Sequence, residues 1–211
     1  NDFIKLMIKS EKKTENNSEK KPAKQSQKKI IQQKEFSYES SVKAIGYVSS
    51  PFKEKFGIPR QPGLMSQAKG IIKLNPDPDL KTALRSLEQF SHLWIVFVFH
   101  QHGGHKWKPS IRPPRLGGNV KVGVLASRSP HRPNPIGISA VAIEKIDLDA
   151  INGPEIFVSG VDLLDGTPVL DIKPYIPYAD SIPEANAGWA AEPIKRHTVV
   201  FNPEALVDLC E

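Results

Sequence analysis

Prolines divide this chain into short segments and so limit the folds that it can adopt. Nineteen of its 211 residues are proline, nearly twice the usual share of about 5%. Because proline fixes its own φ angle and donates no backbone hydrogen bond, it ends helices and interrupts the middle of sheets. The longest uninterrupted apolar run, 93–99, has seven residues, whereas a membrane-spanning helix needs about 20. We therefore expect many fixed turns, few long helices and no transmembrane helix.

The segments between the turns are short runs rich in Val and Ile, a pattern typical of β-strands. The predicted strands are 42–48, 68–74, 93–100, 121–126, 137–146, 155–161, 169–175 and 198–201. Only two helices are predicted, one capped by Asp79 and one beginning at Pro203 after Asn202. The first carries its apolar residues on one face, namely Leu80, Ala83, Leu84 and Leu87. This pattern favours an antiparallel sandwich or barrel over an α/β fold.

The first 40 residues differ in composition from the rest of the chain. They hold ten lysines and six acidic residues, giving +4 of the total charge of +6. Apolar residues are almost absent between Ser10 and Lys29, so this stretch cannot offset its ordering entropy. We predict a flexible basic lead-in over 1–40, a globular domain over 41–200 and the start of a C-terminal extension over 201–211. The lead-in is either a solubilising tail or an arm that touches nucleic acid phosphates.

The sequence excludes several common classes of protein. It contains no Gly-x-Gly-x-x-Gly motif after a strand, no P-loop and no Gly-x-Ser-x-Gly elbow, so neither a Rossmann site, a nucleoside triphosphatase nor an α/β-hydrolase is supported. The single cysteine, Cys210, cannot form an intramolecular disulfide, and no secretory signal is evident. We therefore expect a cytoplasmic protein.

Histidines cluster before a Gly-Gly turn. On a continuing strand His100 and His102 would face the same side, and His105 could reach round from the turn. Such a triad suits a metal, although no acidic residue or cysteine lies beside it. We expect no metal site, and a metal-dependent hydrolase remains a minor alternative.

The segment 127–139, with the sequence SRSPHRPNPIGIS, is the most unusual in the chain. Its three prolines make a stiff loop that projects Arg128, Arg132 and Asn134. Two guanidinium groups on a rigid support suit a carboxylate or phosphate ligand, because each presents a planar fork of donors. The alternative is an arginine-rich surface turn.

Two further segments have a similar character. In 162–175 a tight turn at Asp165-Gly166 leads into a strand on which Asp171, Lys173 and Tyr175 share one face. The segment 58–63 places another arginine, Arg60, between prolines. Taken separately, each segment could be a structural turn.

Taken together, these segments closely resemble the TsaA-like family, also called tRNA methyltransferase O. The resemblance rests on Pro59-Arg60-Gln61, on Phe99-His100-Gln101, on the whole of 127–139, and on the run from Asp165 to Tyr175. It covers about residues 43–178 and does not cover 1–40. It implies a single β-barrel that binds S-adenosylmethionine without a Rossmann fold and acts as a homodimer. The implied reaction methylates N6 of threonylcarbamoyladenosine at position 37 of tRNA.

The resemblance also implies which residues form the site. The implied cofactor contacts are Pro59, Arg60, Gln61, His100, Gln101, Arg128, Ile138, Asp165, Gly166, Thr167 and Pro168. Asp171 and His100 are candidates for a general base. Arg132, Lys173 and Tyr175 are candidate contacts for the substrate, on charge and residue type alone. The rival interpretation is a non-catalytic RNA-binding barrel, which would have no reason to bind the methyl donor.

Overall fold

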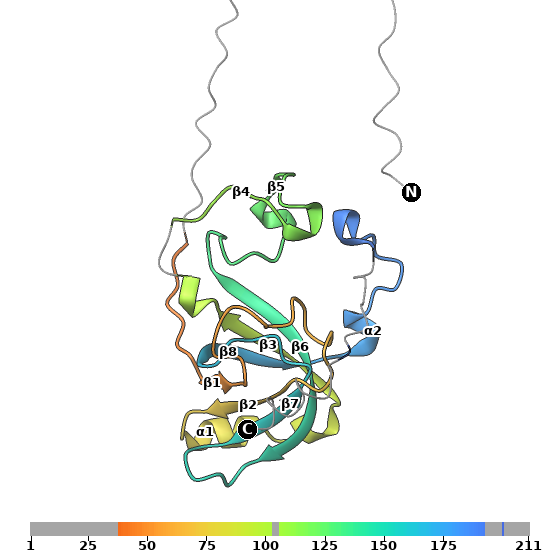
Figure 1. Cartoon of the computed structure of the whole chain (residues 1–211). Helices are drawn as coiled ribbons and strands as arrows, with labels where there is room; N and C mark the ends of the chain where they lie inside the picture. Colours follow the sequence, from red (N-terminus) through yellow and green to blue (C-terminus); the bar gives the residue numbers. More distant parts are fainter. Residues whose placement is uncertain (1–37, 103–105, 193–199, 201–211) are drawn as a thin grey trace, which may run out of the picture. The chain divides into compact units, whose positions relative to one another are not determined.

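The computed structural model describes residues 38–102, 106–192 and 200, and its centre is a closed antiparallel barrel of six strands (Figure 1). Around the barrel the strand order is β1-β2-β7-β6-β3-β8. The strands are β1 (Gly46–Ser49), β2 (Lys69–Leu74), β3 (His92–Val98), β6 (Ile136–Asp147), β7 (Glu155–Ser159) and β8 (Thr167–Pro174). The expectation of a mainly β, barrel-forming domain with few short helices is confirmed.

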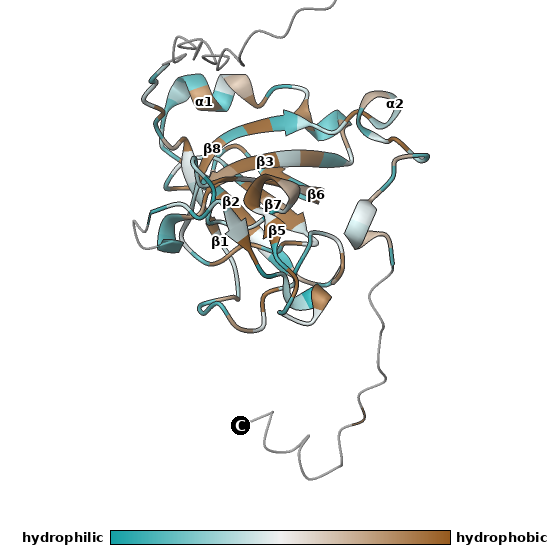
Figure 2. Cartoon of the chain, turned by 90° about the horizontal axis from the view of Figure 1, so that it is seen from above, coloured by the Kyte–Doolittle hydropathy of each residue, from teal (hydrophilic) through white to brown (hydrophobic). Residues whose placement is uncertain are grey.

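Buried and more exposed side chains alternate along the strands, which explains why this sequence forms a barrel with an apolar interior. In β3, Leu93, Ile95 and Phe97 are buried, while Trp94 and Val96 between them are only half-buried. Successive side chains of a strand point to opposite faces, so the buried set fills the barrel interior. Figure 2 shows hydrophobic residues concentrated on these strands. The other core residues come from the barrel strands, from the rim loops and from the segment after α1: Val48, Ile72, Leu74, Leu84, Leu87, Val141, Ile156, Val158, Val161, Leu163 and Val169.

A β-bulge adjusts the pairing of β3 with β8. Val96 pairs with Asp171, but the next residue, Phe97, pairs with Val169, so that Leu170 is the extra residue. Asp171 and Lys173 therefore lie opposite Val96 and Trp94, on the outer face of the barrel. The face that the sequence predicts Asp171 and Lys173 to share is thus the outer surface of the barrel.

Short elements complete the described chain. The helices are α1 (Pro78–Ala83) and α2 (Pro177–Asp180), and the 3-10 turns are η1 (Leu87–Gln89), η2 (His100–His102), η3 (Pro114–Leu116), η4 (Val124–Ala126) and η5 (Gly188–Ala190). A two-stranded sheet of β4 (Ser110–Ile111) and β5 (Val122–Gly123) lies at the end of the molecule away from α1 (Figure 1). No described helix is long and apolar enough to cross a membrane.

Three local predictions are wrong in detail. The strand expected over 121–126 is only Val122–Gly123 followed by a 3-10 turn, and Leu125 is 73% exposed because this run does not face the core. The first helix is capped by Asp77, whose carboxylate accepts from the backbone N–H of Asp79 at 2.9 Å. Its predicted apolar face is interrupted, because Leu87 follows the left-handed residue Ser86 in a separate turn.

The predicted end segments fall largely outside the described part of the chain. The strand over 198–201 is described only at residue 200, and the helix after Asn202 not at all. The chain divides into two units, residues 1–40 and 41–211. Of the first unit only residues 38–40 are described, and they contain no helix or strand. The flexible lead-in and the C-terminal extension therefore stay predictions.

Candidate functional site

Four strand ends meet at one rim of the barrel. The end of β3 pairs with the start of β6 through Val98 and Ile136, and Phe97 pairs with Val169 near the start of β8. The end of β1 in turn pairs with the start of β8. Because neighbouring strands are antiparallel, the loops 50–67, 99–135 and 160–166 all emerge at this end, which we call the loop rim. The three sequence motifs, 58–63, 127–139 and 162–175, all begin on these loops.

A cavity of about 670 Å³ opens at the loop rim, within the range of about 300–1,000 Å³ typical of small-molecule sites. We call it the inner cavity. Its lining is Lys55, Ile58, Phe97, Val98, Phe99, His100, Gln101, His102, Lys108, Pro130, His131, Asp162, Leu163, Leu164 and Thr167. The apolar members continue the barrel core to the surface. A ligand here would meet an apolar floor and a few polar groups.

Asp162 is the acidic residue in this lining. Its Oδ1 accepts a hydrogen bond from the hydroxyl of Ser139, which is itself 1% exposed, at 2.7 Å. Burial raises the pKa of the Asp162 carboxyl above its usual range, and the Ser139 hydrogen bond and the charge of Arg128 only partly oppose this effect. A carboxylate that burial strips of its hydration shell is a stronger base, and its ionised form lowers the stability of the fold.

A second, wider hollow of about 1430 Å³ adjoins the inner cavity. We call it the basic groove. Its lining is Arg60, Gln61, Lys108, Ser110, Ile111, Arg112, Pro113, Pro114, Arg115, Lys121, Ala126, Ser127, Arg128, Ser129, His131, Ala187, Trp189, Ala190 and Glu192. Lys108 and His131 line both hollows. The groove is therefore continuous with the inner cavity along these two residues.

Two of the sequence motifs touch directly in the groove. The guanidinium Nη1 of Arg128 donates to the side-chain Oε1 of Gln61 at 2.7 Å, across 67 residues of sequence. Arg128 stands on the proline loop, and Gln61 stands on the loop after β1. The contact leaves the other guanidinium donors of Arg128 available to a ligand, since Arg has five N–H groups.

The Asp165-Gly166 turn is held by the loop after β1. The Asp165 carboxylate accepts from the backbone N–H of Ser50 at 2.9 Å and pairs with Lys53 at 2.8 Å. These two partners lower the pKa of Asp165 below its usual range. Gly166 adopts a φ of 73°, a conformation that glycine takes without strain. This turn fixes the start of β8, where the Thr167 hydroxyl donates to the carbonyl of Leu164 at 2.7 Å.

The structure divides the predicted cofactor contacts into three groups. His100, Gln101 and Thr167 line the inner cavity, and Arg60, Gln61 and Arg128 line the basic groove. Five line neither hollow: Pro59, Ile138, Asp165, Gly166 and Pro168. Ile138 lies on the outer face of β6, opposite Val96, and is 48% exposed.

The other predicted site residues are not brought to the two hollows. Arg132 braces its own loop, donating from Nη1 to the carbonyl of Ser127 at 2.8 Å. Asp171 pairs with Lys173 at 2.7 Å on the outer face of β8. Tyr175 packs its ring against Trp94, with ring centroids 5.5 Å apart. Of the two candidate bases, His100 lines the inner cavity and Asp171 lines neither hollow.

The histidine cluster has a different geometry from the one predicted. His100 and His102 lie in a 3-10 turn and not on a continuing strand, because β3 ends at Val98. The ring of His102 packs edge-on against that of His131, with centroids 4.5 Å apart. His105 lies outside the described residues. Among those that are described, no group of three His, Cys, Asp or Glu side chains is placed to hold a metal ion.

Sequence reasoning missed Asp162 and most of the groove cations. Asp162 stands three residues before the Asp-Gly turn, and no local pattern shows that its carboxylate loses water on folding. The sequence does contain a signal for the groove cations, because no acidic residue occurs between Glu88 and Glu144. These cations are Lys108, Arg112, Arg115 and Lys121.

These features define a class of protein: a closed β-barrel without a Rossmann fold, with a ligand-sized cavity and a cationic groove side by side at one rim. Residues 47–181 match the sequence profile of the tRNA-methyltransferase O N-terminal domain. The chain therefore belongs to the tRNA methyltransferase O family.

Known relatives support this assignment. The tRNA (adenine(37)-N6)-methyltransferase of Escherichia coli is 48% identical over 161 residues, covering 76% of this chain and 68% of the relative. The human protein of the same name is 46% identical over 143 residues, covering 65% of this chain and 30% of the relative. The crystal structure of TrmO from Pseudomonas aeruginosa superposes with a TM-score of 0.62 at 46% identity, covering 75% of this chain and 66% of that one. The chain thus spans about two thirds of its bacterial relatives.

The raised pKa of Asp162 predicts a specific pH dependence of stability. Between the pKa of an unfolded Asp, about 4, and the raised pKa of folded Asp162, the folded carboxyl keeps its proton while the unfolded one loses it, so the free energy of unfolding falls as the pH rises through this window. Asp162→Asn keeps the acceptor for Ser139 and removes the charge. We expect its melting temperature to exceed that of the wild type at pH 7 and the difference to vanish towards pH 4.

Asp165 provides the matched control, because its pKa is lowered. Its ionised form stabilises the fold above about pH 4, and this contribution is lost as the pH falls through the folded-state pKa. Asp165→Asn should therefore melt below the wild type at pH 7. A melting temperature of Asp162→Asn below the wild type at pH 7 would show that the Arg128 charge outweighs the burial of Asp162.

Proposed function

We propose that this chain transfers the methyl group of S-adenosylmethionine to N6 of threonylcarbamoyladenosine at position 37 of tRNA. The observation that carries the proposal is the family match over the barrel, together with the direct contact of two of its motifs at Arg128 and Gln61. The relatives from E. coli and human are named for the adenine-37 N6 reaction. A relative from P. aeruginosa, 49% identical over 166 residues, carries the provisional name S-adenosylmethionine-dependent methyltransferase RcsF.

The polar groups at the loop rim fit the chemistry of this cofactor. S-adenosylmethionine carries a carboxylate, an adenine and positive charge at its amine and its sulfur. Arg60 and Arg128 offer guanidinium forks to a carboxylate, while His100 and Gln101 offer hydrogen-bonding side chains beside an apolar floor suited to an aromatic ring. We infer that the cofactor is held by these four residues and Thr167.

When bound, the cofactor supplies an electrophilic methyl group on a sulfonium. The chain must then position the target nitrogen and accept its proton, since the N6 lone pair is delocalised into the purine and the carbamoyl group. We assign Asp162 as the general base, whose carboxylate accepts this proton. It lines the inner cavity beside His100 and Thr167, and its raised pKa makes it a stronger base than an exposed aspartate.

Cofactor binding and methyl transfer test the proposal directly. S-adenosylmethionine at 100 times its dissociation constant should stabilise the protein by about 2.7 kcal/mol, measured as a rise in melting temperature. Purified protein should also transfer labelled methyl groups to tRNA from cells that lack this activity, and nucleoside mass spectrometry should place the label on threonylcarbamoyladenosine. A chain that binds the RNA but not the cofactor would instead be a non-catalytic RNA-binding barrel.

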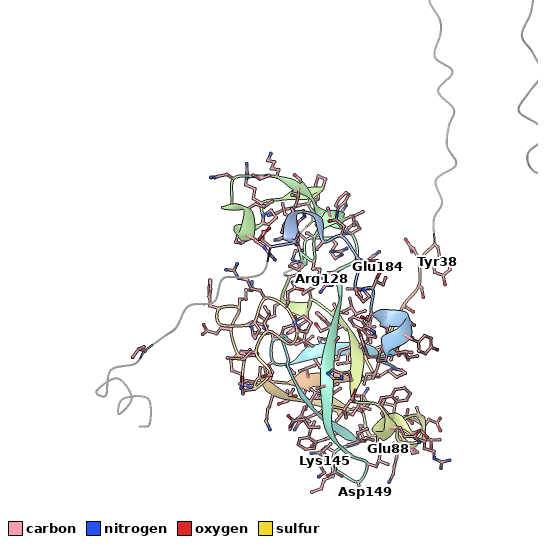
Figure 3. The ribbon with its side chains drawn as sticks, turned by 90° about the vertical axis from the view of Figure 1, so that its right-hand side faces the viewer. Tyr38, Glu88, Arg128, Lys145, Asp149 and Glu184 are labelled. Atoms are coloured by element: carbon pink, nitrogen blue, oxygen red, sulfur yellow. The ribbon has the colours of Figure 1, made fainter. Side chains whose placement is uncertain are left out.

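The role of Asp162 can be separated from that of Asp171. General base catalysis contributes about 10²–10⁴-fold, so Asp162→Asn should lower kcat by that order while the cofactor dissociation constant stays close to that of the wild type. Asp171→Asn removes a carboxylate on the outer face and provides the direct comparison. Asp149→Asn, at the opposite end of the barrel (Figure 3), is the neutral control. Loss of turnover in Asp171→Asn alone would reassign the base.

We further propose that the protein acts as a homodimer in the cytoplasm. Ile136 and Ile138 are 44% and 48% exposed on the outer face of β6, beside half-buried Val96 of β3. A second copy would cover these apolar side chains. Sedimentation of the wild type should give a mass of about twice the 23.4 kDa of one chain, and Ile136→Glu should give the mass of one chain. A wild-type protein with the mass of one chain would contradict the dimer.

A further inference from the structure

One stretch of the barrel domain carries a large excess of positive charge. Residues 89–143 contain seven Lys or Arg and no Asp or Glu, whereas the whole chain carries only +6. The seven are Lys106, Lys108, Arg112, Arg115, Lys121, Arg128 and Arg132. Figure 3 shows Arg128 towards one end of the molecule and Glu88, Lys145 and Asp149 at the other. Folding thus separates the acid-free stretch from the carboxylates that flank it in sequence.

The structure gathers five of these seven cations around one hollow. Lys108, Arg112, Arg115, Lys121 and Arg128 line the basic groove, and Arg60 joins them from the loop after β1. Glu192 is the acidic residue in that lining. Clustered like charges of this kind raise the local concentration of a polyanion and speed its association.

Among the described residues, no ion pair within 4.0 Å involves a groove cation. In the described part of the chain the six ion pairs all use lysines elsewhere: Lys53, Lys69, Lys73, Lys81, Lys145 and Lys173. Arg112, Arg115 and Lys121 are exposed, and no ion pair with a described carboxylate restrains them. Their positive charge is therefore available to a ligand from outside.

The backbone that carries these cations is braced. β4 pairs with β5, the N–H of Val124 donates to the carbonyl of Pro109 at 3.0 Å, and the N–H of Lys108 donates to the carbonyl of His131 at 2.9 Å. The indole N–H of Trp189 donates to the carbonyl of Ala126 at 3.0 Å, which ties η5 to the same lobe. The cations are thus presented at fixed spacing and not on a free arm.

The size of the groove, with one tryptophan in its wall and another next to Lys108 in sequence, favours a nucleic acid over a small anion. About 1430 Å³ is larger than a typical small-molecule pocket. Trp189 in its wall is 37% exposed, and Trp107, between Lys106 and Lys108 in sequence, is 51% exposed. Aromatic rings interleaved with cations are the combination that binds nucleic acid, the cations through phosphates and the rings by stacking.

We propose that the basic groove binds the phosphate backbone of the RNA next to the target nucleotide. This inference rests on the proposed function and assigns a surface to its substrate. Because Lys108 and His131 line both hollows, a base placed in the inner cavity would leave its flanking phosphates at the groove. Three groove residues belong to no sequence motif and are not among the proposed cofactor contacts: Arg112, Arg115 and Lys121.

The test uses the full chain with Arg112→Ala and Arg115→Ala combined, and Arg85→Ala as a control for loss of one surface arginine outside the groove. Arg85 is an exposed arginine just after α1, at the end of the molecule away from β4 and β5. The probe is a fluorescein-labelled RNA stem–loop carrying threonylcarbamoyladenosine in its loop. Anisotropy titrations at several salt concentrations give the affinity and its salt slope, and calorimetry gives the affinity for S-adenosylmethionine.

We expect the double variant to bind the RNA on the order of tenfold more weakly near physiological salt, since each lost phosphate contact removes about 0.7–0.9 from the slope of log affinity against log salt. The slope should therefore fall by about 1.4–1.8 in magnitude. The melting temperature, the cofactor affinity and kcat at saturating RNA should match the wild type, with the change appearing in KM. Arg85→Ala should bind the RNA as the wild type does.

Several outcomes would overturn the groove assignment, and they are distinct from failure of the proposed function. Unchanged RNA affinity in the double variant, or equal loss in Arg85→Ala, would show that the groove does not hold the backbone even if the wild type methylates tRNA. Loss of affinity for an acidic peptide but not for RNA would indicate a protein partner instead. Groove-dependent RNA binding without any methyl transfer by the wild type would keep the groove and reject the methyltransferase.

Discussion

Closure of the barrel by the pairing of β1 with β8 decides where every loop of the candidate site lies. The Val48–Thr167 pair aligns the end of β1 with the start of β8, while β3 aligns with both β6 and β8. Loops that are separated by 67 residues, such as those of Gln61 and Arg128, meet as a result. An open sheet with the same strands would leave β1 and β8 as distant edges and divide the site between them.

The burial of one carboxylate connects the fold to the proposed chemistry. Asp162 follows the buried Val161 and precedes the buried Leu163, so the chain cannot move it to solvent without disturbing the core. The same desolvation that makes its ionised form costly also makes it a better proton acceptor. Such opposition between stability and function is common at active sites. Asp165 shows no such opposition. Lys53 and Ser50 stabilise its ionised carboxylate, and this carboxylate in turn holds the turn before β8.

The sequence predicts the fold well wherever a rule is local. Alternating apolar residues mark the strands from Lys69 to Pro174, and the Asp165-Gly166 turn lies where the dipeptide indicates. Family resemblance adds the barrel and the rim motifs. Predictions fail where long-range pairing decides. No local pattern reveals that β3 ends at Val98, which puts His100 into a turn and not on a strand.

Burial and charge separation are the parts of the site that a single sequence reveals least. The desolvation of Asp162 depends on Ser139, 23 residues away, and on the closed loop rim. The acid-free stretch is visible in the sequence, but its meaning depends on where the neighbouring carboxylates go. Had β6 been short, Glu144 would lie near the groove and could neutralise it. Because β6 runs the twelve residues Ile136–Asp147, its acidic end is carried to the far side of the barrel. The long strand therefore keeps one rim positive, which is the condition for a phosphate backbone to approach the cavity.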